Sequence, residues 1–205
     1  MTNGGYIVET HPTRIKSWKE LNEKNIIMQR YDYSCGAASL ATLLRYYFKE
    51  YMTEQSLLNE INDIFDEQEL NTIKQSGLSF LELEKICQIK GYQVASVRLN
   101  ITALKQLQGP VLVFIQPEGY KHFAILRGVV EDRVFLADPS RGNIRMSVAK
   151  FLEEWSGETL IVGKKRFGLP ANHPLAIYHR PGFRQELLIL REFLRNEPPL
   201  PVKAP

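Results

Sequence analysis

The sequence predicts an α+β fold, with helices in the N-terminal part of the chain and antiparallel strands after them. Apolar residues recur at three- and four-residue steps between residues 35 and 107, which is the spacing of helices that bury one face. A continuous apolar run follows at residues 111–115, between two prolines, and is typical of a buried strand. The chain has 205 residues, 44% of them hydrophobic, which is enough for one domain with a substantial core.

The first predicted helix begins at Cys35. The residues expected on its buried face are Ala37, Leu40, Ala41, Leu44 and Phe48. Asp32 and Ser34 stand just before it, and both are residue types that cap helix N-termini. Small side chains at residues 36–39 would let this helix approach another backbone closely.

Three further helices are predicted before the strands. One covers residues 53–65, one runs over residues 80–90, and a short one lies near residues 102–107. Ser79 and Glu82 have the spacing of a capping box, and Gly91 fits the position just after the helix end. The acidic residues at 66–69 are interpreted as an exposed loop, and Cys87 as a structural thiol on an apolar helix face.

Short apolar segments at residues 111–115, 122–126 and 134–137 are predicted strands, and residues 144–146 and 159–162 could extend the sheet. Three regions follow: a polar lead-in at 1–24, a main domain at 25–163, and a C-terminal extension at 164–205. The extension holds seven of the eleven prolines and carries eight Lys or Arg against three Glu. It includes one predicted amphipathic helix, at residues 184–195, and its charge is interpreted as a solvated face.

Charge and composition exclude several function classes. A net charge of +3 is too small to argue for nucleic acid, and no apolar run is long enough for a transmembrane segment. No signal peptide is present as written, so the cytoplasm is the default expectation unless a signal was trimmed. No Cys or His spacing resembles a metal site, and no cofactor is expected. His11, His173 and His179 are expected at the surface or in loops.

Cys35 is the candidate nucleophile. A thiolate is the reactive form of cysteine, and a helix N-terminus or a nearby imidazolium favours it. The predicted helix start supplies the first of these, and a histidine brought in by the fold would supply the second. A buried, inert thiol is the alternative interpretation of Cys35 taken alone.

His122 is the best candidate base because it opens a predicted strand, where a side chain is held rigidly. Asp138 ends the next strand and is followed by a proline. A hairpin folded about residue 130 would bring the two together and let the carboxylate orient the imidazole. Asp138 could otherwise simply begin a turn. Gln29, six positions before Cys35, carries an amide that could donate to an oxyanion together with the Cys35 N–H.

These residues lie in segments that resemble a known family. QRYDYSCGAASLATLL at residues 29–44 resembles the nucleophile motif of the bacteriocin-processing, double-glycine leader peptidases, which are papain-like cysteine peptidases. HFAILRGVVEDRVFLADPSRG at 122–142 resembles their histidine strand and Asp-Pro segment, and GLSFLELEKICQIKGY at 77–92 resembles their central helix. The resemblance covers roughly residues 25–162, and implies that 25–163 is a peptidase domain of papain-like fold.

The resemblance implies cleavage of a peptide bond through a thioester acyl-enzyme, with Cys35, His122, Asp138 and Gln29 in the roles given above. It implies a peptide or protein substrate with a small-residue, Gly-Gly-like cleavage site, and association with an export system. The well-known members are domains of transporters, and since no transmembrane segment or nucleotide-binding domain is recognised in this sequence, we expect a stand-alone member without transporter domains. A thiol acyltransferase and a non-catalytic peptide-binding module on the same fold are the alternatives.

Overall fold

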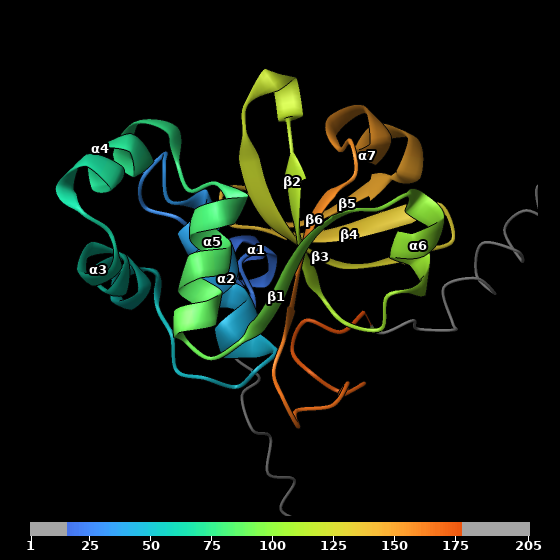
Figure 1. Cartoon of the computed structure of the whole chain (residues 1–205). Helices are drawn as coiled ribbons and strands as arrows, with labels where there is room; N and C mark the ends of the chain where they lie inside the picture. The colour runs from blue at the N-terminus through green and yellow to red at the C-terminus, as the bar shows by residue number, and fades with distance from the viewer. Residues whose placement is uncertain (1–15, 178–205) are drawn as a thin grey trace, which may run out of the picture.

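The computed structural model describes residues 16–177 of the chain (Figure 1). The helices are α1 Trp18–Asn22, α2 Cys35–Tyr46, α3 Glu54–Ile64, α4 Glu67–Ser76, α5 Phe80–Ile89, α6 Ile101–Gln106 and α7 Val148–Glu154, with a 3₁₀ turn at Pro117–Gly119. The strands are β1 Gln93–Arg98, β2 Val111–Ile115, β3 His122–Val130, β4 Arg133–Asp138, β5 Gly142–Ser147 and β6 Glu158–Gly163. The predicted α+β class is confirmed.

The six strands form one antiparallel sheet in the order β1-β6-β2-β3-β4-β5. Helices cover both faces of the sheet, with α2 to α5 on one side and α6 and α7 on the other (Figure 1). Side chains alternate along each strand between the two cores: Leu112 joins the α2 side, whereas Val111 and Val113 join the α6 and α7 side. Burial on both faces explains why the β2 sequence is apolar at every position.

Helix α2 is the central helix of the larger core, and its residues from Cys35 to Leu44 are all buried. Its small residues allow the close approach that the sequence predicted. A Cβ at Gly36 would lie only 3.3 Å from the Leu78 Cβ, and the Ser39 hydroxyl donates to the Phe123 carbonyl of β3 at 3.0 Å. The start of α2 is therefore held directly against the start of β3.

The structure corrects the interpretation of residues 66–69. Asp66 is the N-cap of α4, and its carboxylate accepts from the Glu69 backbone N–H at 2.8 Å while Glu69 reaches back in a capping box. Ile73 is the one fully buried residue of α4, which explains why the apolar pattern there is weak. Strand β1 was also not predicted, because its side chains are exposed or half-buried along its whole length.

Residues 164–177 pack against the sheet and α2. The Arg127 guanidinium donates to the carbonyls of Leu175 and Ala176 at 2.9 and 3.1 Å, and Leu175 is fully buried. His173 is buried, which corrects its expected place at the surface, and its ring meets that of Tyr47 edge-on at 4.8 Å. His11, His179 and the predicted helix at 184–195 lie outside the described residues.

Within residues 16–177 no helix combines the length and the apolar character that crossing a membrane would require.

Candidate active site

Cys35 is the first residue of α2, as predicted, and it is only 6% exposed. Ser34 occupies the N-cap position, but its side chain makes no cap hydrogen bond to the helix. The first N–H groups of a helix have no partner within the helix and carry the positive end of its dipole. The head of α2 therefore presents backbone donors and a favourable field for negative charge at the thiol.

His122 begins β3 and Asp138 ends β4, as predicted from the sequence. The His122 Nε2 and the Asp138 Oδ1 lie 3.0 Å apart, with His122 only 8% exposed and Asp138 fully buried. The Cys35 side chain is also near enough to the His122 ring to raise its pKa. Because Nε2 faces the carboxylate, the other ring nitrogen, Nδ1, remains for the sulfur. The structure thus brings Cys35, His122 and Asp138 into one chain of contacts.

The hairpin that joins these two residues differs slightly from the predicted one. Its turn lies between Val130 and Arg133, and an irregularity between Leu126 and Gly128 shifts the register. Ile125 pairs with Ala137, so Asp138 would lie opposite residue 124, and His122 stands two residues beyond that point. The carboxylate therefore reaches the imidazole diagonally across the two strands, which is within reach for side chains on one face.

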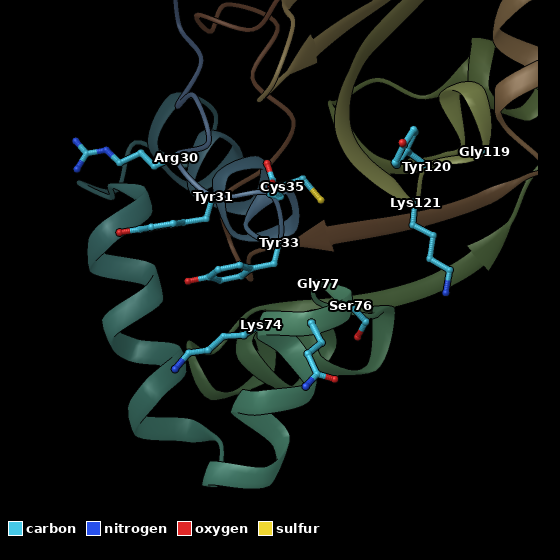
Figure 2. Close-up of a pocket in the computed structure, with 12 residues that line it drawn as sticks. Arg30, Tyr31, Tyr33, Cys35, Lys74, Ser76, Gly77, Gly119, Tyr120 and Lys121 are labelled. Carbon is cyan, nitrogen blue, oxygen red and sulfur yellow. The ribbon is translucent and has the colours of Figure 1, made fainter.

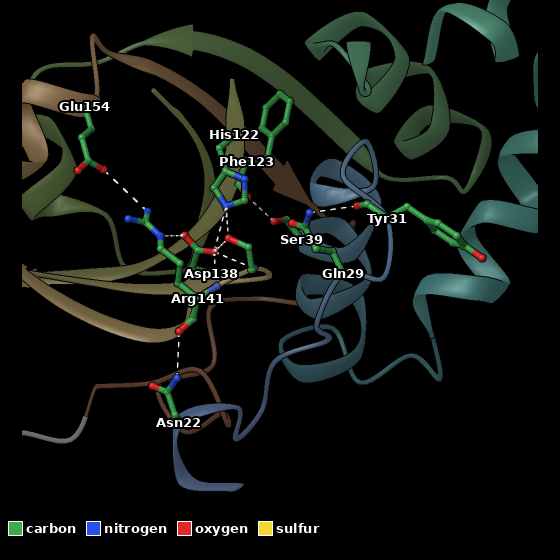
Figure 3. A network of polar contacts seen from close by, with 10 residues as sticks. Asn22, Gln29, Tyr31, Ser39, His122, Phe123, Asp138, Arg141 and Glu154 are labelled. Atoms are coloured by element: carbon green, nitrogen blue, oxygen red, sulfur yellow. Dashed lines mark hydrogen bonds and ion pairs between the residues drawn. The ribbon is translucent and has the colours of Figure 1, made fainter. Parts of the chain in front are cut away.

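Asp138 is held by more donors than the sequence prediction included (Figure 3). Its Oδ1 accepts from the backbone N–H groups of Ser140 and Arg141, at 2.8 and 2.9 Å, and from the Ser140 hydroxyl at 2.8 Å. Its Oδ2 accepts from the Arg141 Nε at 2.9 Å, and Arg141 in turn faces Glu154. A carboxylate with this many donors has a fixed orientation and stays ionised.

The pKa values of the pair follow from these contacts. Burial alone would lower the pKa of His122, but the hydrogen bond and negative charge of Asp138, together with the neighbouring Cys35 side chain, raise it to about 9. For Asp138, burial opposes ionisation, but the hydrogen bond and charge of His122, with Arg141 and Ser140, hold its pKa far below the ordinary value. His122 is therefore an imidazolium at neutral pH, paired with a carboxylate.

Gln29 connects the Asp138 turn to the segment before Cys35. Its backbone N–H donates to the Pro139 carbonyl at 2.8 Å, and its side-chain Nε2 donates to the Tyr31 carbonyl at 3.0 Å. An amide nitrogen has two N–H groups, so one remains after the bond to Tyr31. Its Oε1 is buried and has no hydrogen-bond partner within the described part of the chain.

A cleft opens on both sides of Cys35. One part, of about 650 Å³, is lined mostly by residues with polar or charged groups, among them Arg30, Tyr31, Tyr33, Lys74 and Tyr120 (Figure 2). The other part, of about 340 Å³, is lined mainly by Leu78, Phe80, Phe114 and Phe123. Cys35, Ser76, Gly77 and Lys121 border both parts, so the thiol lies where the two meet. An extended chain could run across the sulfur from a polar subsite into an apolar one.

The second thiol has a different environment. Cys87 is 1% exposed on the apolar face of α5, and burial, with the nearby Glu84 charge, raises its pKa to about 12. It is therefore unreactive at neutral pH, as expected for a structural thiol. Across residues 16–177 no group of three His, Cys, Asp or Glu side chains could hold a metal ion.

Comparison with protein families identifies a match between residues 23–166 and the model described as "Peptidase C39 family". Among individual proteins, the "Probable functional amyloid protease FapD" of Pseudomonas fluorescens is 30% identical over 149 residues, which cover 70% of this chain and 62% of that protein. The chain thus spans less than two thirds of that relative. The "Lactococcin-G-processing and transport ATP-binding protein LagD" of Lactococcus lactis is 26% identical over 140 residues, 67% of this chain and 18% of that protein.

Solved structures show the same fold. A double glycine motif protease from an AMS/PCAT transporter, in complex with the leader peptide, aligns with a TM-score of 0.58 at 23% identity, covering 70% of this chain and 94% of that one. The peptidase domain of Streptococcus ComA aligns with a TM-score of 0.57 at 20% identity, covering 70% and 99%. With the family match over more than half of its length, the chain belongs to the Peptidase C39 family of cysteine peptidases.

Proposed function

We propose that the chain is an endopeptidase that cleaves a leader-type peptide through a thioester acyl-enzyme. The observation that carries this proposal is the placement of Cys35, at the head of α2, beside His122, whose Nε2 is held by Asp138. This is the arrangement that activates a thiol: a nucleophile, a base within hydrogen-bond reach, and a third group that orients the base.

The reaction follows from the charges of the resting site. The imidazolium of His122 favours the thiolate form of Cys35. The sulfur attacks the substrate carbonyl carbon, a C–S bond forms, and the carbonyl electrons move to the oxygen. The tetrahedral adduct collapses when the C–N bond breaks, and His122 gives its proton to the departing amine. Water, deprotonated by the now neutral His122, then attacks the thioester and releases the acid and the thiolate.

Two donors are proposed for the oxyanion. One is the Cys35 backbone N–H at the start of α2, and the other is the second amide N–H of Gln29. The support for Gln29 is its fixed place: its backbone is bonded to the Asp138-Pro139 turn, and its side chain to the loop before Cys35. Asp138 holds the imidazole ring in one orientation throughout the reaction and remains a carboxylate.

The proposed substrate is a peptide with small residues at the cleavage site, as in Gly-Gly. The support comes from relatives: a protease of the double glycine motif was solved with its leader peptide, and LagD is named for processing and transport. The cleft on both sides of Cys35 suits an extended chain. Association with an export system belongs to the same proposal.

The test is cleavage of a panel of leader-type peptides that differ at the two residues before the scissile bond. Wild type should cut after Gly-Gly, Cys35→Ala should abolish turnover without loss of the fold, and Cys87→Ala should still cleave. Mass spectrometry of products formed with an added amine separates hydrolysis from acyl transfer. Cleavage by Cys35→Ala at the wild-type rate would overturn the mechanism. Equal cleavage rates for peptides with and without glycine at these two positions would overturn the substrate assignment.

A further inference from the structure

A buried carboxylate holds the loop that leads to the nucleophile. Glu54, the first residue of α3, has a side chain that is only 4% exposed. Its Oε1 accepts hydrogen bonds from the Ser34 hydroxyl at 2.6 Å and from the Arg30 backbone N–H at 2.8 Å. A carboxylate is costly to bury unless it is hydrogen-bonded, and these two short bonds offset that cost.

Glu54 also forms an ion pair with Arg30, which is weaker than its two hydrogen bonds. Its Oε2 lies 3.8 Å from the Arg30 Nε, and the Arg30 side chain is 73% exposed. At this distance, with the guanidinium in solvent, the ion pair contributes little to stability. The role of Glu54 therefore depends on its ability to accept two hydrogen bonds from the loop, more than on its charge.

The bond to Ser34 changes what the head of α2 presents to the cleft. A serine at an N-cap usually accepts from an N–H of the first turn. Here Ser34 has φ −94° and ψ 8°, outside the extended region typical of caps, and its hydroxyl contacts Glu54 and the Tyr31 carbonyl. Ser34 thus gives α2 no side-chain cap, and its bonds instead hold the peptide unit that carries the Cys35 N–H, a group that has no acceptor within the helix.

The same loop also holds the second proposed donor. The Tyr31 carbonyl accepts from the Gln29 Nε2 at 3.0 Å and from the Ser34 backbone N–H at 3.1 Å, and the Ser34 hydroxyl oxygen lies 2.8 Å from it. Glu54 is bonded to this loop on either side of that carbonyl, at Arg30 and at Ser34. Both oxyanion donors are therefore attached to a segment whose two ends Glu54 fixes.

We propose that Glu54 is a positioning residue for the oxyanion hole, acting through Ser34 and the Tyr31 carbonyl. This inference rests on the proposed peptidase function. It adds a residue from α3 whose side chain makes no hydrogen bond, in the described structure, to any of the four predicted site residues. In the described structure Glu54 has no hydrogen bond to Cys35 or His122, and it lines neither part of the cleft. Its loss should weaken stabilisation of the tetrahedral oxyanion and leave the reactivity of the thiol unchanged.

The experiment compares Glu54→Ala, Glu54→Gln and Ser34→Ala in the full chain. Three quantities are measured: kcat/KM on a Gly-Gly peptide, inhibition by the matching peptide aldehyde, and the alkylation rate of Cys35 by iodoacetamide. The aldehyde forms a tetrahedral adduct that needs the oxyanion hole, whereas alkylation does not. Glu60→Gln is the matched control, because Glu60 is another α3 carboxylate whose partner, Lys90 at 2.7 Å, is remote from the loop.

We expect Glu54→Ala to lower kcat/KM by about tenfold or more, and to weaken aldehyde binding by the same factor, because misplaced oxyanion donors lose much of their effect. Alkylation of Cys35 should stay at the wild-type rate. Ser34→Ala should show the same pattern to a smaller degree, and Glu54→Gln should recover part of the loss because its amide oxygen still accepts hydrogen bonds. Glu60→Gln should behave as wild type.

Two results would overturn the inference. One is hydrolysis at the wild-type rate in both Glu54→Ala and Ser34→Ala. The other is a fall in alkylation that matches the fall in hydrolysis, which would assign Glu54 to general folding. If Glu54→Ala does not fold, Ser34→Ala and Glu54→Gln decide by the same criteria. Failure of the proposed function is a separate result, because it would appear as turnover in Cys35→Ala.

Discussion

Replacing Asp138 by Asn tests how the buried carboxylate sets the charge of His122. The pKa of His122 stands at about 9 against an ordinary 6.5, although burial acts to lower it, because Asp138 and Cys35 favour the protonated ring. That difference is worth about 3 kcal/mol in favour of the imidazolium. Asn keeps the size of the side chain and an oxygen acceptor but removes the negative charge 3.0 Å from the His122 Nε2.

If Asp138 supplies even half of this stabilisation, the pKa of His122 falls by about one pH unit or more in Asp138→Asn. Without a protonated His122 the departing amine has no acid, so the alkaline limb of kcat/KM should move toward neutral pH by the same amount. The pH range in which folding stability is lost on the alkaline side should move toward neutral pH as well. The raised pKa of His122 stabilises the wild-type fold fully below pH 6.5, and this contribution is lost as the pH rises through about 9.

The assay is kcat/KM from about pH 5.5 to 10 on a Gly-Gly peptide, with urea unfolding over the same range. Glu154→Gln is the matched control, because Glu154 faces Arg141 at 3.9 Å but makes no hydrogen bond or ion pair with His122 in the described part of the chain. It should keep the alkaline limb of the wild type. An alkaline limb in the same place in Asp138→Asn and wild type would refute the reasoning.

Two further predictions concern residues 164–177. Arg127→Ala removes the hydrogen bonds to the Leu175 and Ala176 carbonyls and should lower the free energy of unfolding by about 2–3 kcal/mol. Trypsin should then cut faster at residues 164–166. An unchanged cutting rate would contradict the role of Arg127. Burial and the Arg127 charge lower the pKa of His173, so its contribution to stability is full above pH 6.5 and is lost as the pH falls below that value. His173→Phe keeps the ring contact with Tyr47 and should reduce the loss of stability between about pH 6.5 and 5 in urea titrations; an equal loss in the variant would exclude His173 as its source.

The meeting of Cys35, His122 and Asp138 could be predicted because each of the three residues has a local signal. Cys35 stands where a polar loop meets a helical apolar pattern, and His122 and Asp138 stand at the ends of apolar strands. The hairpin between the strands is local in sequence, so its geometry follows from a turn signal. Its register was less predictable, because the irregularity between Leu126 and Gly128 has no local signal and lies beside Ile177 and Leu175, which are distant in sequence.

Other features depend on contacts that the sequence does not reveal. Glu54 looks like any acidic residue in a first helical turn, and its partners lie 20 and 24 positions away. Helix α4 had a usable signal, since Asp66 and Glu69 have capping-box spacing, but its weak apolar face favoured the loop interpretation. The donors around Asp138 could have been found from the Asp-Pro-Ser-Arg turn, because Asp commonly accepts from N–H groups two and three residues on.

The central claim is that Cys35 and His122 act as one reactive pair, and the alkylation of Cys35 at about pH 6 tests it most directly. Iodoacetamide should label Cys35 rapidly in the wild type and at least about tenfold more slowly in His122→Ala, with Cys87 unlabelled in both native proteins. Equal rates at Cys35 with and without the imidazole, or equal labelling of the two cysteines, would contradict the account.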